Sequence, residues 1–487
     1  MPDRRPILLP ALSPTAWDRL GTRLGGTLVR PGDPAYDLAK RLQYTHYDVI
    51  KPAGIAYCEN VMDIRACLDF AAHNGIPAHV RSGGHSMGGW STGDGLVIDV
   101  SRINHVSVAG SLVRIGAGTR SVDDLHALQP LDRQMVTGTS PNVSAAGFLS
   151  GGGIGWQTRK FGMACDRIAA AAMVLADGTL VRCSSTVEPD LYWAVRGGGG
   201  GNFGILVAFE IRPIDAPSLT AFETTWHIDD AVGVLVAWQA WSVAAPAELG
   251  STLLLLPPFG PDGQAIVKIL GAFHGPRDEL SVHLNELTAA AGARPLTSTV
   301  YDQRSYTDGM HGLMCAGLTV AQCQRTGDDP HAKVPRNPFT VQTCRLVDNA
   351  FDTATAAKLV AVWEQGTGRE RCLQCTATGG AANTVGRADT AYAHRDARFL
   401  LGFQAVSRDP APSADDIAEL TAWTDNADAV LAPLASGCYI NFPNTKPPAD
   451  WGTAYYGENY QRLLDVKRKY DPTGFFRHAG SLRPMGG

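Results

Sequence analysis

The chain has 487 residues, enough for two or three domains with buried cores, and this size favours an enzyme over a small binding module. A net charge of -5, without clusters of Lys and Arg, argues against a nucleic-acid or anionic-membrane surface. Apolar runs such as residues 168–176 fall short of the roughly 20 residues of a bilayer span. Prolines interrupt residues 1–20 where a signal peptide would be apolar. We therefore expect a soluble, unexported protein that binds neither nucleic acid nor membrane.

Ten cysteines without regular spacing do not suggest a disulfide framework. We expect most of them to be small buried hydrophobic side chains in a reducing cytoplasm. The Cys-x-x-Cys at residues 372–375 has no second pair, which also favours core cysteines. A mixed-polarity segment at residues 309–338 lacks the tight ligand spacing of a zinc site, although it contains His311, Cys315, Cys323 and His331. No metal is predicted.

The first part of the chain reads as an α+β nucleotide-binding domain. Asn60 is a good N-cap for an amphipathic helix, and Gly75 is a good stop for it. The spacing of Ser121 and Asp124 is that of a capping box before a short helix. Alternating or continuous apolar residues predict strands at residues 76–80, 95–100 and 112–115.

The strand at 76–80 leads into the sequence Arg81-Ser-Gly-Gly-His-Ser-Met-Gly-Gly-Trp90. Glycines let backbone N–H groups approach a ligand closely, and consecutive N–H groups form an anion-binding nest. A dinucleotide pyrophosphate would fit there. The motif is neither a Rossmann fingerprint nor a Walker loop. By itself, a glycine-rich turn is more often only a turn.

Two further glycine clusters follow, at residues 137–155 and 197–204. Separated clusters suggest one long ligand held at both ends, and three clusters in one domain are hard to explain as turns. Asp177-Gly178 predicts a β-hairpin, and residues 205–211 predict a strand. Between 216 and 434 the clusters disappear. Apolar strands there alternate with helical segments such as 231–241 and 278–291, which fits a sheet backed by helices.

Together these motifs resemble the berberine-bridge-enzyme-like branch of the FAD-linked oxidoreductases, in the vanillyl-alcohol-oxidase or PCMH-type superfamily. The matching elements follow in order along nearly the whole chain, at residues 81–86, 151–165, 193–204, 439–444, 456–460 and 467–472. The closer likeness is to bacterial oxidases of sugars and secondary metabolites, including those of antibiotic biosynthesis.

The resemblance implies an α+β fold with a PCMH-type FAD-binding domain made of two α/β subdomains. This domain would comprise residues 1–213 and, after a return of the chain, residues 435–487. A substrate-binding domain at residues 214–434, with an antiparallel sheet backed by helices, would interrupt it.

The resemblance also implies that FAD is attached twice, through His85 to its 8α-methyl and through Cys165 to ring carbon C6. Imidazole and thiolate are nucleophiles that can add to these electron-poor positions. A single bond to His85 is the alternative. Alone, His85 would be a turn histidine and Cys165 a buried thiol. The further cofactor contacts implied are Arg81, Ser82, Gly83, Gly84, Ser86, Gly88, Gly138, Thr139, Ser140, Gly147, Gly151, Gly155, Ile168, Val207, Asn441, Tyr456 and Asn459.

Tyr439 stands where the resembling sugar and antibiotic oxidases keep a catalytic tyrosine. A phenol titrates near 10, so its neighbours or the flavin must make it more acidic. The alternative is a buried tyrosine that packs over the ring. Gln404 and Tyr392 are candidate substrate contacts, although Gln404 serves equally well as a structural residue.

At two places the sequence differs from that of family members, and each difference argues against one type of reaction. Residues 398–405 lack the glutamate that acts as a base in berberine bridge enzyme, so N-methyl oxidation with ring closure is not expected. Thr378 precedes Gly379-Gly380 where some relatives carry a second tyrosine, which argues against a two-step oxidation with two tyrosines.

The expected reaction oxidises an alcohol or hemiacetal of a sugar or secondary metabolite to a carbonyl, with hydride transfer to flavin N5 and O2 reduced to H2O2. Amine or C–C dehydrogenation, a non-oxygen acceptor and a binding protein without catalysis are the alternatives. Ile168 bears on whether O2 is the electron acceptor, because oxidases of the family carry a valine at this position.

Overall fold

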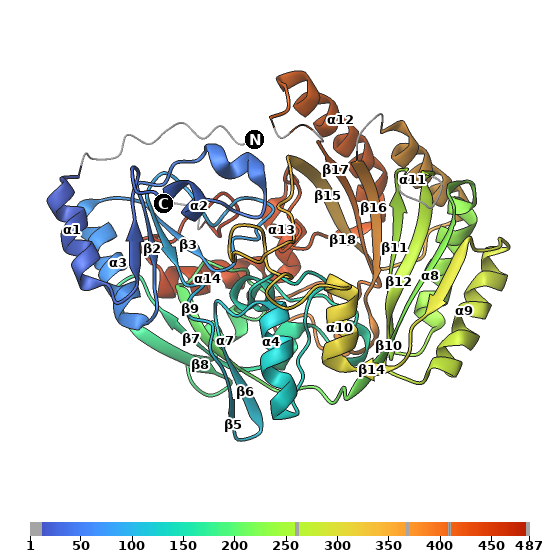
Figure 1. The fold of residues 1–487 in the computed structure, drawn as a ribbon, viewed down its shortest axis with the longest axis horizontal. Helices are drawn as coiled ribbons and strands as arrows, with labels where there is room; N and C mark the ends of the chain where they lie inside the picture. The colour runs from blue at the N-terminus through green and yellow to red at the C-terminus, as the bar shows by residue number, and fades with distance from the viewer. Residues whose placement is uncertain (1–11, 259–262, 367–369, 408, 410, 484–487) are drawn as a thin grey trace.

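The computed structural model describes residues 12–258, 263–366, 370–407, 409 and 411–483. Two small sheets and their helices form one half of the molecule, and a large sheet with its helices forms the other (Figure 1). The prolines in residues 1–20 argue against a signal peptide, and the part of this segment at residues 1–11 lies outside the described residues. No helix in the described part of the chain is long and apolar enough to cross a membrane.

The first sheet has four strands in the order β1-β2-β4-β3. Helix α3 (Val61–Asn74) connects β2 to β3, and both of these strands run parallel to β4. The side chain of Asn60 accepts hydrogen bonds from the N–H groups of Met62 and Asp63, and Gly75 ends the helix with φ 63°. The predicted helix and its ends are confirmed. The strands are β1 (Thr27–Val29), β2 (Gly54–Tyr57), β3 (Ala78–Arg81) and β4 (Leu96–Asp99).

The second sheet has five antiparallel strands in the order β5-β6-β9-β7-β8. The predicted hairpin at Asp177-Gly178 is confirmed, since it joins β7 to β8. The predicted capping box is wrong. Ser121 is already the first residue of α4 (Ser121–Leu128), and its hydroxyl donates to the carbonyl of Val143. The strands are β5 (Val106–Ala109), β6 (Leu112–Gly116), β7 (Ile168–Val174), β8 (Leu180–Ser184) and β9 (Ile205–Ile211).

The third sheet has nine strands, all paired antiparallel, in the order β13-β10-β12-β11-β16-β17-β15-β18, with β14 also paired to β10. Large apolar side chains such as Trp226, Trp238 and Phe403 form its core. The strands are β10 (Ser218–His227), β11 (Leu249–Leu256), β12 (Ile266–Phe273), β13 (Thr297–Val300), β14 (Arg304–Ser305), β15 (Thr340–Val347), β16 (Glu370–Ala377), β17 (Phe399–Val406) and β18 (Ala435–Gly437).

Helices cover the outer face of this sheet (Figure 1), as the sequence predicts. Two of them contain the predicted helical segments 231–241 and 278–291. The helices are α8 (Ala231–Ala244), α9 (Arg277–Ala291), α11 (Thr353–Gln365) and α12 (Ala414–Leu431). The mixed architecture confirms the predicted fold class.

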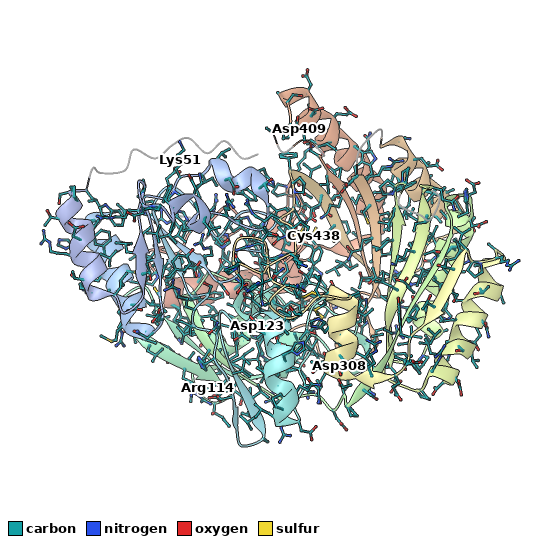
Figure 2. The ribbon with its side chains drawn as sticks, viewed as in Figure 1. Lys51, Arg114, Asp123, Asp308, Asp409 and Cys438 are labelled. Carbon is teal, nitrogen blue, oxygen red and sulfur yellow. A yellow bond between two sulfur atoms is a disulfide. The ribbon has the colours of Figure 1, made fainter. Side chains whose placement is uncertain are left out.

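After β18 the chain returns to the first half of the molecule (Figure 1). Lys467 on α14 donates to the carbonyl of Asn202 at 2.6 Å and forms a buried ion pair with Asp471. Cys438, at the start of the return, is fully buried and lies at the junction of the two halves (Figure 2). The remaining helices are α1 (Pro14–Arg23), α2 (Tyr36–Ala39), α5 (Ala145–Ser150), α6 (Thr158–Phe161), α7 (Pro189–Ala194), α10 (Tyr306–Cys315), α13 (Trp451–Tyr456) and α14 (Tyr460–Tyr470).

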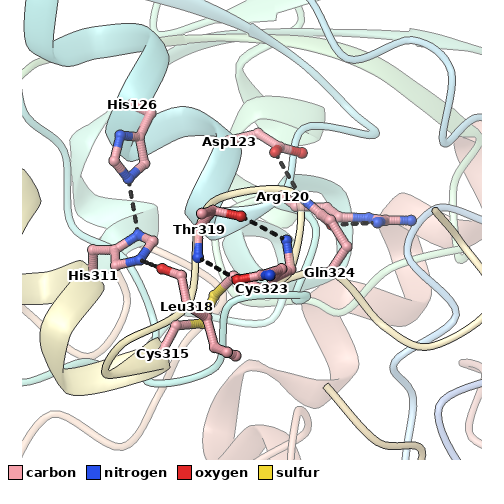
Figure 3. The surroundings of a disulfide bond; sticks show 10 residues. Arg120, Asp123, His126, His311, Cys315, Leu318, Thr319, Cys323 and Gln324 are labelled. Carbon is pink, nitrogen blue, oxygen red and sulfur yellow. Dashed lines mark hydrogen bonds between the residues drawn. A yellow bond between two sulfur atoms is a disulfide. The ribbon is translucent and has the colours of Figure 1, made fainter. Parts of the chain in front are cut away.

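The cysteines follow the sequence prediction with one correction. Eight are free, and all of these except the half-buried Cys372 are buried. Cys315 and Cys323, in contrast, form a disulfide next to the contact between α4 and α10 (Figure 3). Because α10 ends at Cys315 and the chain turns back, the two residues come together across a short loop.

Candidate active site

A cavity of about 340 Å³ lies where the glycine clusters meet the C-terminal return. Among the described residues that line it, only Gln404 on β17 comes from the large sheet. The predicted site residues that line the cavity are Ser82, Gly83, Gly84, His85, Ser86, Gly138, Thr139, Ser140, Gly147, Gln404, Tyr439 and Asn441.

Residues 82–86, here called the cradle, form one wall of the cavity. The strand before it ends at Arg81, whose buried guanidinium pairs with Asp99 on β4 and so faces the sheet. A Cβ on Gly83 would lie 2.5 Å from the hydroxyl of Ser144, so the Ser144 side chain can lie this close only to a glycine. The cradle therefore brings backbone close to whatever fills the cavity.

Buried polar atoms without partners lie beside the cradle. The Ser144 hydroxyl lines the cavity, and it has no hydrogen-bond partner among the described residues. Neither amide atom of the buried Asn142 has one there. Buried polar groups are nearly always hydrogen-bonded. These atoms, together with the glycine-lined backbone, fit a long polar ligand such as a dinucleotide.

The imidazole of His85 lines the cavity and contacts the side chains of Ser140 and Tyr44. Its Nε2 lies 3.3 Å from the Ser140 hydroxyl, and its ring meets the edge of Tyr44 at 6.4 Å between centroids. Burial, together with the positive charges of Arg325 and Arg120, lowers the pKa of His85 to about 4. The imidazole is therefore neutral, and hence nucleophilic, at pH 7.

Cys165 is fully buried and is not among the residues that line the cavity. Its N–H donates to the Gly152 carbonyl at 2.8 Å, and its Sγ lies 3.7 Å from an oxygen of Asp166. That carboxylate is held by two hydrogen bonds from Arg395, at 2.7 and 2.9 Å. Burial and the charge of Asp166 raise the pKa of Cys165 well above its ordinary value, so the thiol is protonated here.

Tyr439 lines the cavity and accepts two hydrogen bonds at its hydroxyl. The Gly153 N–H donates at 2.8 Å and the Asn441 side-chain amide donates at 3.1 Å. Burial raises the pKa of Tyr439, while these donors act in the opposite direction. A Cβ on Gly151 would lie 2.0 Å from Asn441 Oδ1, which shows how closely the end of α5 packs against Asn441.

The remaining predicted residues lie outside the described lining. Tyr392 packs edge-on behind Tyr439, with 6.2 Å between ring centroids. The Tyr456 hydroxyl donates to the Gly198 carbonyl, and the Asn459 amide donates to the carbonyls of Arg387 and Thr390. The full set is Arg81, Gly88, Gly151, Gly155, Cys165, Ile168, Val207, Tyr392, Tyr456 and Asn459.

The cavity also contains residues that the sequence did not single out. Trp90 stacks on His478 with 5.1 Å between ring centroids, and His478 Nε2 lies 3.3 Å from the Gly200 carbonyl. Burial lowers the pKa of His478 to about 3. Trp90 ends the glycine-rich motif and could have been considered from its position. His478 belongs to no motif and comes close only through the C-terminal return.

No Asp or Glu is among the described residues that line the cavity. Its polar groups are backbone amides, hydroxyls, amides, two histidines and Arg477. A buried ammonium group would need a carboxylate partner, and these lining residues offer none.

Two family models match the chain. Residues 52–184 match the FAD binding domain, and residues 438–483 match the model described as "Berberine and berberine like". The uncharacterized FAD-linked oxidoreductase YgaK of Bacillus subtilis is 29% identical over 95% of this chain and 98% of its own. The (R)-6-hydroxynicotine oxidase of Paenarthrobacter nicotinovorans is 27% identical over 95% of this chain and 97% of its own.

Solved structures share the whole fold. A chitooligosaccharide oxidase superposes with a TM-score of 0.83 at 25% identity, covering 97% of this chain and 100% of that one. Glucooligosaccharide oxidase from Acremonium strictum gives a TM-score of 0.83 at 25% identity, covering 97% and 99%. Both family matches, the order of the motifs and the shared fold agree. The chain therefore contains an FAD-binding domain and a berberine-like segment, and the relatives and solved structures that it resembles include FAD-linked oxidoreductases and oligosaccharide oxidases.

Proposed function

We propose that this enzyme oxidises an alcohol or hemiacetal of a sugar or secondary metabolite to the carbonyl, with O2 as the final acceptor and H2O2 as the second product. The observation that carries the proposal is the Tyr439 hydroxyl, which lines the cavity and accepts two N–H hydrogen bonds. When bound, FAD would supply the hydride acceptor, its N5 atom.

The two halves of the molecule would have different roles. Residues 1–213 and 435–487 would hold FAD, because the cradle, the other glycine clusters and Tyr439 all come from them. Residues 214–434 would form the substrate-binding domain. Its contribution to the cavity is Gln404, whose amide would bind a substrate hydroxyl.

Tyr439 would act as the base that removes the substrate O–H proton. Hydride cannot leave a carbinol carbon readily unless its hydroxyl proton leaves at about the same time, so a base must lie within hydrogen-bond reach. The N–H groups of Gly153 and Asn441 point at the phenol oxygen and would stabilise the negative charge of the phenolate.

His85 and Cys165 would attach FAD covalently, with His85 through the 8α position and Cys165 through C6. Glucooligosaccharide oxidase of Acremonium strictum carries a 6-S-cysteinyl, 8α-N1-histidyl FAD. The neutral, cavity-lining imidazole of His85 supports the first bond. Because Cys165 is buried and protonated, its bond would need the thiol to lose its proton and gain access to the ring.

Amine oxidation is the second candidate, since the relative from Paenarthrobacter is named for a nicotine derivative. The lack of Asp and Glu among the described lining residues favours the alcohol. The oligosaccharide-oxidising relatives point the same way, with chitooligosaccharide oxidase of Gibberella zeae 28% identical over 89% of this chain.

The test compares Tyr439→Phe with Tyr392→Phe, which removes a hydroxyl from the neighbouring ring outside the cavity lining. Oligosaccharides, simple secondary alcohols and cyclic amines are screened first for H2O2 release in air. With the best substrate, we expect Tyr439→Phe to slow anaerobic flavin reduction by roughly 10²–10⁴-fold, the worth of a positioned base. Tyr392→Phe should stay near wild type. Equal rates in wild type and Tyr439→Phe, or turnover of amines alone, would overturn the proposal.

A further inference from the structure

Residues 319–337, here called the strap, follow α10 and form hydrogen bonds with the cradle and with residues next to it. At its end, Asn337 exchanges backbone hydrogen bonds with Gln43 and Thr45 at 2.9 Å. Gln43 in turn donates its N–H to the Gly84 carbonyl at 2.9 Å. The strap is therefore tied to the cradle through a chain of backbone contacts.

Arg325 connects the strap to the cradle directly. Its side chain is almost fully buried, and Nη1 donates to the Gly83 carbonyl at 3.1 Å. Its Nε and Nη2 donate to Asp328 at 3.2 and 2.8 Å. Because the guanidinium is planar, the bonds of Nε and Nη2 to Asp328 fix the direction in which Nη1 points toward the Gly83 carbonyl.

A second set of contacts fixes the other side of Asp328. Arg120 donates to this carboxylate at 2.7 Å and also to Gln324. Gln324 donates to Asp123 on α4 at 2.8 Å (Figure 3). The disulfide between Cys315 and Cys323 lies directly before Gln324. Two arginines thus share one carboxylate beside the cradle, and the positive charges of both act on His85.

We propose that Arg325 is a positioning residue for the attachment of FAD to His85, because it fixes the Gly83 carbonyl two residues before the imidazole and keeps a cation beside it. This inference rests on the proposed covalent bond at His85. In that reaction an imidazole nitrogen bonds to the 8α carbon, each partner loses one hydrogen, and O2 takes up both hydrogens and the two electrons as H2O2.

The surroundings of His85 agree with this role. The charged groups that act on it are Arg325 and Arg120, with Asp328 between them, and its uncharged neighbours are Ser140 and Tyr44. Attachment needs the neutral imidazole, and a nearby cation disfavours the imidazolium. Burial is the largest cause of the low pKa of His85 and the charges of Arg325 and Arg120 add to it, so the imidazole stays neutral to pH values well below 6.

The experiment uses full-length apoprotein carrying Cys165→Ala, so that His85 is the only possible tether. FAD is added at pH 5.5 and pH 7.5, and the flavin that stays on the acid-precipitated chain is measured over time. We expect Arg325→Met to slow attachment about tenfold or more, and to slow it further at pH 5.5. The parent should attach flavin at similar rates at both pH values.

Arg336→Met is the matched control. Arg336 lies in the same strap, forms a bidentate ion pair with Asp48 and donates to the Leu42 carbonyl, but it forms no hydrogen bond with residues 82–86 in the described structure. Equal slowing by both variants, or no slowing by Arg325→Met, would overturn the inference. Arg325→Lys serves if Arg325→Met does not fold. Lysine keeps the positive charge but cannot bond to Asp328 and the Gly83 carbonyl through one planar group. Arg325→Lys should therefore attach flavin slowly, with the same pH dependence as the parent. Attachment at the rate of the parent would overturn the inference.

The two proposals fail in different ways. If the Cys165→Ala parent attaches no flavin, the proposed His85 bond is wrong, and the role of Arg325 falls with it. If the parent attaches flavin and Arg325→Met does so at the same rate, only the inference about Arg325 is wrong.

Discussion

The Tyr439 hydroxyl lies between two N–H donors, and only one of them is a side chain that can be exchanged. Asn441→Asp keeps the shape but replaces the donor with a carboxylate, which raises the pKa of Tyr439. If the phenolate is the active form, the pH at which flavin reduction becomes fast should then move upward by about one unit or more. Anaerobic rapid mixing between pH 6 and pH 10 measures this shift.

Gln404→Glu is the control for that experiment. It introduces the same change from amide to carboxylate in the same cavity, but in the described structure Gln404 forms no hydrogen bond with the Tyr439 hydroxyl. A similar shift in both variants would show that cavity charge alone matters, and the assignment of Asn441 as the specific donor would then be wrong.

His85 lines the cavity and Cys165 does not, yet each is proposed to form one bond to FAD. We expect His85→Ala and Cys165→Ala each to retain flavin on the denatured chain through the other bond, and the double variant to retain none. Absorbance of the acid-precipitated protein, with gel fluorescence, measures retention. Release of all colour from the wild type would rule out covalent attachment altogether.

Among the local elements, the cradle could be predicted well from the sequence. Its glycines, the strand before it and the capped helix before that strand depend on contacts close in the chain. The capping box at Ser121 failed because a long-range hydrogen bond to Val143 takes its hydroxyl. The strap and its disulfide were missed for the same reason, since Arg325 reaches a carbonyl 242 positions away.

The tight packing of the cradle leads to a prediction for Gly83. A Cβ there would lie 2.5 Å from the Ser144 hydroxyl and 3.3 Å from the Asn142 carbonyl, so Gly83→Ala must displace the cradle. We expect the folded variant to incorporate about tenfold less flavin. Gly147→Ala is the control, because Gly147 also lines the cavity but a Cβ there meets nothing within 4 Å. Equal incorporation by both variants would contradict this account.

Across the whole molecule, several histidines are buried in the neutral form. Burial lowers the pKa of His46 and of His274 to about 4, and that of His478 to about 3. Below pH 6.5 the unfolded chain takes up protons there that the folded chain does not. The free energy of unfolding should therefore fall by roughly 1.4 kcal/mol per pH unit for each histidine between about pH 6 and pH 4.

Chemical denaturation at pH 5.0 and pH 7.0 measures this loss of stability. His274→Gln removes one titrating group that is not among the described lining residues of the cavity, and it should reduce the difference in the free energy of unfolding between the two pH values. A difference unchanged by this substitution would show that the folded chain protonates His274 as readily as the unfolded chain does.

The C-terminal return has a consequence for biosynthesis. Tyr439, Asn441 and His478 line the same cavity as the cradle, and Lys467 is bonded to Asn202 in the last glycine cluster. A ribosome adds about 5–20 residues per second. A nascent chain that has reached residue 430 therefore carries a complete glycine-rich motif but an open cavity. Capture of the cofactor must await the emergence of residues 438–483, so ribosome-bound intermediates of this protein should be colourless.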